Sequence, residues 1–150
     1  RRAGVEVKTV GIGSKNICGA HNISVMVDMS DDELTNFDAD MIILPGGMPG
    51  TLNLDASKVV HKAIDNASTN GKYIAAICAA PSILGNRELL VGKEAICYPG
   101  FEDELKGASV TGAAVETDGK VITACGMGAA RCRLAAYSGG GGQRAYSPHP

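Results

Sequence analysis

Aromatic residues and strong net charge are both scarce in this sequence of 150 residues. Tryptophan is absent and aromatic side chains make up only 4% of the chain, too few for the stacking surfaces that bind single-stranded nucleic acid. The formal net charge is −2, so a strongly charged surface for nucleic acid or membranes is not expected. No apolar run approaches the roughly 20 residues that a membrane-spanning helix needs. We therefore expect no nucleic-acid partner and no membrane partner.

Paired cysteines are also lacking. The cysteines are odd in number and none belongs to a C-x-x-C pair, which argues against both a disulfide framework and a zinc site. We therefore expect no metal and a reducing, cytoplasmic location. The five cysteines are Cys18, Cys78, Cys97, Cys125 and Cys132.

The remaining composition is typical of a globular protein, because 45% of the residues are hydrophobic. We expect one α/β domain over residues 1–136 and a disordered tail over residues 137–150, a stretch that includes four consecutive glycines. At the other end, Arg1 to Gly4 resembles the last turn of a glycine-capped helix, and Val5 to Val10 resembles a strand. We therefore expect a further strand and helix upstream of this sequence.

Alternating strands and helices are predicted in the middle of the chain. Met41–Leu44 is a continuous apolar run ended by Pro-Gly-Gly, as expected for a strand buried on both faces of a parallel sheet. A helix capped by Asp55 or Ser57 leads to a second buried strand at Tyr73–Ile77, and this order predicts a βαβ crossover. The apolar residues of that helix recur at helical spacing: Val59, Val60, Ala63, Ile64 and Ala67.

Shorter strands are predicted on either side of this unit. Residues 23–27 and 94–98 are strand candidates, and the turn pair Asp118 and Gly119 predicts a hairpin whose second strand covers residues 121–124. The following Gly-Met-Gly lacks the third glycine of a dinucleotide fingerprint, because Arg131 occupies that position. We therefore expect no nucleotide.

Residues 73–84, YIAAICAAPSIL, place one cysteine where a strand should give way to a helix. Pro81 suits the first turn of that helix, so the thiol of Cys78 would face a helix N-terminus that stabilises a thiolate. A tight turn flanked by alanines would also project the side chain away from the sheet, as a nucleophile elbow does. Gly46 and Gly47 end the preceding strand at the same edge of the sheet, where their N–H groups can approach an oxyanion. The residues alone leave open whether Cys78 is a nucleophile or a small buried hydrophobe.

The pair of motifs formed by LPGG at residues 44–47 and AAICAAPSIL at residues 75–84 resembles the ThiJ/PfpI superfamily, and Cys-Ala-Ala-Pro is most similar to its DJ-one branch. The resemblance runs from Arg1 to about Ala130. It implies a flavodoxin-like α/β sandwich of three layers, with a mostly parallel sheet and a β-hairpin, and a homodimer. It also implies an oxidation-sensitive cysteine at Cys78 and a cofactor-independent activity on a small reactive carbonyl or glycated substrate, of the glyoxalase or deglycase type.

The resemblance assigns site roles to few residues. Cys78 would attack the carbonyl, and Gly46, Gly47, Ala79 and Gly126 would surround the oxyanion and substrate. Tyr98 matches a histidine of some relatives and could donate a hydrogen bond, although a phenol is a poor base near neutral pH.

The acidic residue that contacts the cysteine in relatives comes from a segment before Arg1, so the motif assigns an acidic partner to no residue of this chain. The sequence after residue 130 also departs from the long helix of the family. Two alternatives therefore stand beside the enzyme: a non-enzymatic oxidation sensor or chaperone that works through Cys78, and an inactive fragment.

Overall fold

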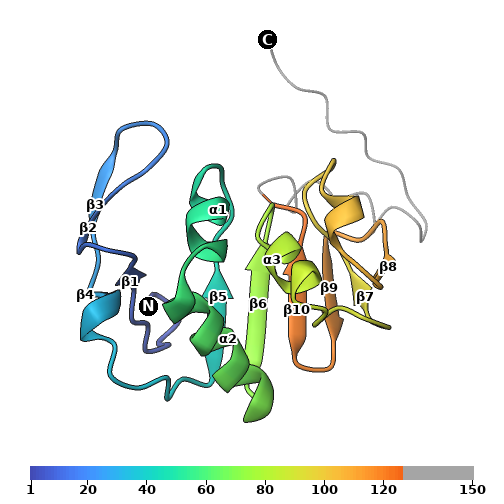
Figure 1. The fold of residues 1–150 in the computed structure, drawn as a ribbon, viewed down its shortest axis with the longest axis horizontal. Coiled ribbons are helices and arrows are strands. Elements are labelled where there is room, and N and C mark those ends of the chain that lie inside the picture. The colour runs from blue at the N-terminus through green and yellow to red at the C-terminus, as the bar shows by residue number, and fades with distance from the viewer. Residues whose placement is uncertain (127–150) are drawn as a thin grey trace.

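The computed structural model describes residues 1–126, and its centre is a four-stranded mixed sheet (Figure 1). The strand order is β5 (Met41–Leu44), β6 (Tyr73–Ile77), β10 (Val121–Ala124) and β9 (Val115–Asp118). The first three strands are parallel to one another and β9 runs antiparallel to β10. The α/β class, the mostly parallel sheet and the hairpin of β9 and β10 are therefore confirmed.

Three pairs of short strands lie outside the central sheet. In the N-terminal part, β1 (Val10–Gly11) pairs in parallel with β4 (Met29–Ser30). The antiparallel pair of β2 (Asn16–Cys18) and β3 (Ser24–Met26) forms a hairpin. Near the site described below, β7 (Glu94–Ala95) pairs in parallel with β8 (Ser109–Val110).

The helices are α1 (Gly50–Asp55), α2 (Lys58–Thr69) and α3 (Pro81–Asn86), with short 3₁₀ turns η1 (Asp31–Glu33) and η2 (Glu102–Glu104). Helix α2 begins at Ser57, whose hydroxyl accepts a hydrogen bond from the N–H of Val60 at 3.4 Å, as expected of an N-cap residue. Helix α3 begins with Pro81, where the missing N–H costs nothing. The chain order β5–α2–β6 with parallel strands is the predicted βαβ unit.

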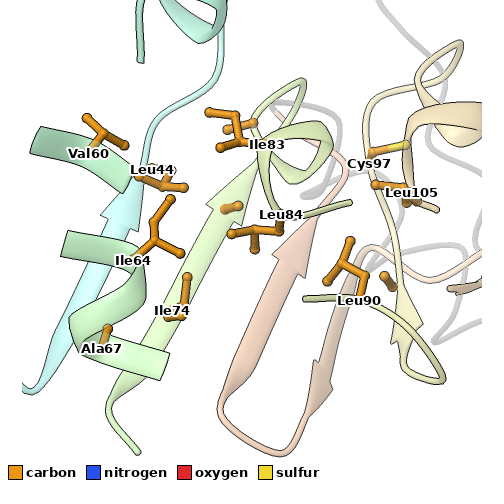
Figure 2. Packing of buried hydrophobic residues seen from close by; sticks show 13 residues of the cluster. Leu44, Val60, Ile64, Ala67, Ile74, Ile83, Leu84, Leu90, Cys97 and Leu105 are labelled. Atoms are coloured by element: carbon orange, nitrogen blue, oxygen red, sulfur yellow. The ribbon is translucent and has the colours of Figure 1, made fainter. Parts of the chain in front are cut away.

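The hydrophobic core lies between the central sheet and helices α2 and α3 (Figure 2). Ile64 of α2 and Ile83 and Leu84 of α3 are fully buried. They face Leu44 of β5 and Ile74 of β6, which are also buried. Burial of apolar area on this face is the main term that holds β5 and β6 in place, and both of these strands end at the cysteine site.

The opposite face of β5 and β6 is apolar but open among the described residues. Ile43 is 63% exposed and Ile77 is 36% exposed, and Met41 and Tyr73 are exposed as well. The expectation that these two strands are buried on both faces is therefore wrong for residues 1–126, since α2 and α3 cover only one face.

Two of the predicted strands are much shorter than expected. The strand expected over residues 5–10 is reduced to Val10 within β1, because β4 runs beside Val10 and Gly11 only, and Val5 and Val7 are exposed. The strand expected over residues 94–98 ends at Ala95, because the N–H of Ile96 turns to the hydroxyl of Thr123 instead of to β8. The boundary expected near Ala136 lies outside the described residues. No helix within residues 1–126 is long and apolar enough to cross a membrane.

Candidate active site

Cys78 lies between the end of β6 and the start of α3, at the predicted strand-to-helix turn. Its φ is +64°, a left-handed conformation that few residues other than glycine adopt. Such a backbone is costly and persists only where surrounding contacts enforce it, which is characteristic of nucleophile elbows. The thiol is half-buried, and its neighbours Ala79 and Ala80 are buried.

Two hydrogen bonds hold the peptide groups of Cys78. Its N–H donates to the carbonyl of Ala124, at the end of β10, with a distance of 2.9 Å. Its carbonyl accepts from the N–H of Tyr98 at 2.8 Å. The strained residue is therefore fastened to the neighbouring strand and to the loop that follows β7.

Two glycines lie directly against the cysteine. A methyl group added to Gly46 would lie 2.5 Å from the Cβ of Cys78 and 2.5 Å from the carbonyl oxygen of Ile77. A methyl group added to Gly126 would lie 3.4 Å from the sulfur of Cys78. A side chain therefore cannot fit at position 46, whereas Gly126 packs closely beside the sulfur.

The N–H groups of Gly47 and Ala79 make no hydrogen bond to any residue between 1 and 126. Gly47 has a φ of +98°, which suits glycine, and its carbonyl accepts both the N–H of Thr51 at 2.8 Å and the hydroxyl of Thr51 at 3.0 Å. The carbonyl of Gly47 is thus held in place, while its N–H is unused by the described chain. Unused N–H groups on a fixed backbone are the donors that an oxyanion requires.

Tyr98 is placed at the site by its backbone. Its side chain is 51% exposed, and among the described residues its hydroxyl makes no hydrogen bond. The structure therefore brings Gly46, Ala79, Gly126 and the main chain of Tyr98 together around Cys78, and among the described residues the hydroxyl of Tyr98 makes no hydrogen bond to the sulfur.

A second thiol, Cys97, lies close to this site in the buried core (Figure 2). Cys97 is 1% exposed, and burial raises the pKa of its thiol to about 11, with a smaller contribution from the negative charge of Glu102. Its sulfur is therefore protonated and inaccessible at neutral pH.

Carboxylates near the site are engaged elsewhere. Glu102 accepts a hydrogen bond from the N–H of Gly100 at 2.6 Å, and within residues 1–126 no carboxylate hydrogen-bonds the thiol of Cys78.

A cavity of about 240 Å³ lies nearby between α1, α3 and η2, with Thr51, Ser82 and Glu104 in its wall, but Cys78 does not line it. No three His, Cys, Asp or Glu residues of the described chain are grouped in a way that could hold a metal ion.

Sequence reasoning missed Cys125 as a residue of this region. It follows β10 directly, just as Cys78 follows β6, and these two strands are hydrogen-bonded neighbours. The signal was available, because both cysteines come immediately after a predicted strand. What the sequence did not provide was the order of the strands in the sheet.

The fold and the site together define a class of protein: an α/β domain with a cysteine in a nucleophile elbow at the carboxyl edge of its sheet. The family comparison then identifies it: the DJ-1/PfpI family matches residues 1–133, and the chain belongs to that family.

Several curated relatives are similar to this chain. It is 36% identical over 131 residues to Protein DJ-1 homolog B of Arabidopsis thaliana, which covers 85% of this chain and 30% of the relative. It is 31% identical over 133 residues to Protein dj-1beta of Drosophila melanogaster, covering 87% of this chain and 71% of that one. It is 31% identical over 128 residues to a deglycase of Pyrococcus horikoshii, covering 82% of this chain and 75% of the relative. The chain spans only 30% and 34% of the two Arabidopsis relatives.

Solved structures share the fold. The crystal structure of Drosophila melanogaster DJ-1beta superposes with a TM-score of 0.78 at 27% identity, covering 92% of this chain and 76% of that one. Oxidized DJ-1 of Toxoplasma gondii superposes with a TM-score of 0.80 at 29% identity, covering 91% and 76%. The flavodoxin-like fold expected from the resemblance is thereby confirmed.

Proposed function

We propose that this protein is a cysteine-dependent, cofactor-independent enzyme that acts on small reactive carbonyls or on their protein adducts, with Cys78 as the nucleophile. The observation that carries the proposal is the left-handed backbone of Cys78, packed against Gly46 and followed directly by Ala79, whose N–H, like that of Gly47 after Gly46, is unused by the described chain. Two archaeal relatives named as deglycases support the same class of substrate.

The first step follows from these groups. The thiolate of Cys78 adds to the aldehyde carbon of an α-oxoaldehyde, a carbon–sulfur bond forms, and the electron pair of the C=O bond moves onto oxygen. The N–H groups of Gly47 and Ala79 stabilise that oxyanion, which then takes a proton from water to give a hemithioacetal. Neither donor has to break a hydrogen bond with the described chain before it binds the oxyanion.

The later steps require a base. A proton leaves the former aldehyde carbon and another is added at the neighbouring carbon, while the hydroxyl proton on the former aldehyde carbon passes to the oxygen of its neighbour, which gives a thioester of a 2-hydroxy acid. Water hydrolyses this thioester and regenerates the thiol. Because no described carboxylate hydrogen-bonds the sulfur, we expect solvent or buffer to serve as the base, and turnover to be slow.

The test is the conversion of methylglyoxal to lactate by the full chain and by Cys78→Ser. We expect activity that rises with buffer-base concentration in the parent chain and is lost in Cys78→Ser. Cys18→Ser is the matched control, because Cys18 is exposed on β2, outside the central sheet, and should leave the rate unchanged. A folded parent chain that neither forms lactate nor removes methylglyoxal adducts from a glycated peptide would contradict the proposal.

A further inference from the structure

Two cysteines occupy equivalent positions on neighbouring strands. In the parallel pair of β6 and β10, Ile77 lies opposite Ala124, so the next residue on each strand is a cysteine, Cys78 and Cys125. The N–H of Cys78 donates to the carbonyl of Ala124 at 2.9 Å, which is the last ladder bond of the pair formed by Ile77 and Ala124. Each cysteine therefore directly follows the last paired residue of its strand.

The spacing at this point suits a covalent link. A methyl group on Gly126, the residue after Cys125, would lie 3.3 Å from the Cβ of Cys78 and 3.6 Å from its Cα. Neighbouring strands are about 4.8 Å apart, which falls within the roughly 4.4–6.8 Å between Cα atoms that a disulfide spans. Both cysteines are half-buried. Side-chain rotation at the ends of two paired strands can therefore bring the sulfurs together.

We propose that Cys125 is the resolving thiol of Cys78, so that oxidation of Cys78 by a hydroperoxide ends in a reversible disulfide between the two strands. This proposal is independent of the carbonyl reaction, because it needs only an accessible sulfur at Cys78 and a second thiol beside it.

The chemistry balances as a two-electron oxidation. The thiolate of Cys78 attacks a hydroperoxide, a sulfur–oxygen bond forms, the O–O bond breaks, and the leaving oxygen takes a proton to become an alcohol or water. The thiolate of Cys125 then attacks the sulfenic sulfur of Cys78. The S–S bond forms, the S–O bond breaks, and the hydroxide leaves as water after taking up a proton. Two thiols and one hydroperoxide thus give one disulfide.

The other thiol near Cys78 is a poor competitor for this role. Cys97 is buried in the core, and its pKa of about 11 leaves very little thiolate at neutral pH. Because the attacking group must be a thiolate, Cys97 is disfavoured as the resolving thiol.

Trypsin separates the thiols, so peptide mass spectrometry can test the proposal. Cleavage after lysine and arginine places Cys78 in residues 73–87, Cys97 in residues 94–106 and Cys125 in residues 121–131. The full chain is treated with one equivalent of hydrogen peroxide, quenched with an alkylating agent and digested without reductant. We expect peptides 73–87 and 121–131 to be joined through a disulfide that reductant cleaves, with the loss of two hydrogen atoms.

The variant Cys125→Ser should instead gain one and then two oxygen atoms at Cys78, and Cys125→Ala should behave alike. Cys97→Ser should form the same disulfide as the parent chain. Slow alkylation of the buried Cys97 shows that each Cys125 variant is folded. The proposal is overturned if the parent chain and Cys125→Ser gain oxygen at Cys78 equally, if Cys78 is joined to another cysteine, or if Cys78 is not oxidised.

Discussion

Replacing Gly46 by alanine should disturb the cysteine site more than any comparable small change. The added methyl group would lie 2.5 Å from two firmly held atoms, the Cβ of Cys78 and the carbonyl oxygen of Ile77. Ordinary contacts of this kind begin near 3.4 Å. The turn must therefore move by about 1 Å, and overpacking of this kind costs about 1–3 kcal/mol. For a domain of this size, that loss lowers the Tm by roughly 2–12 °C.

The assay combines thermal unfolding with the rate of iodoacetamide alkylation of Cys78, followed on the peptide of residues 73–87. We expect Gly46→Ala to lower the Tm and to change the Cys78 rate about tenfold, since the elbow is displaced. Gly50→Ala is the neutral control, because a methyl group there meets nothing within 4 Å. Gly85→Ala is the stability control, because its methyl group would lie 2.0 Å from the carbonyl oxygen of Glu104, in the core and away from the elbow.

Gly85→Ala should lower the Tm while the folded protein keeps its Cys78 rate. If Gly46→Ala matches the parent chain in both Tm and alkylation rate, the close approach of Gly46 does not hold the elbow, and the reasoning is refuted.

Three further predictions rest on single side chains. Cys97 should be alkylated at pH 8 at least about 100-fold more slowly than an ordinary thiol, since its pKa is raised from 9.0 to about 11. For the same reason the native state should lose stability as the pH rises from 9 to 11, and Cys97→Ala should remove this pH-dependent loss. Ser57→Ala should cost about 1 kcal/mol in chemical denaturation because it removes the cap of α2, whereas the exposed Ser68→Ala should cost nothing measurable. The N–H of Thr9 lowers the pKa of Asp28, and the hydroxyl of Thr9 and the charge of Arg1 lower it further, so the stabilisation from this contact is present above pH 3.8 and is lost as the pH falls through the lowered pKa. Asp28→Asn should therefore speed amide exchange at Thr9 at neutral pH, and an unchanged exchange rate would count against a stabilising contact between Asp28 and Thr9.

Local patterns in the sequence predict the central fold well. The runs Met41–Leu44 and Tyr73–Ile77 and the hairpin around Gly119 are found where expected, because apolar continuity and turn chemistry are local signals. Pairing is not local, so the sequence could not show that residues 5–9 have no partner strand within residues 1–126 or that residues 96–98 turn towards Thr123 and Cys78.

The candidate site, like the fold, could be predicted only in part from the sequence. The position of Cys78 in a strand-to-helix turn follows from Pro81 and its alanine neighbours, but the contact between Gly46 and Cys78 depends on the order of β5, β6 and β10. The roles assigned to Cys78, Gly47, Ala79 and Tyr98 stay predictions, as does the homodimer, which light scattering of the full chain would measure.

The two hydrogen bonds that fasten Cys78 also make the site measurable from within. The amide protons of Cys78 and Tyr98 are both donors in those bonds, so neither can exchange with solvent deuterium until the turn, β10 and the following loop separate. The protection of these two amides from exchange therefore measures the free energy of local opening at the reactive sulfur. A ligand that engages the site should slow both amides together, even where the rest of the sheet exchanges as before.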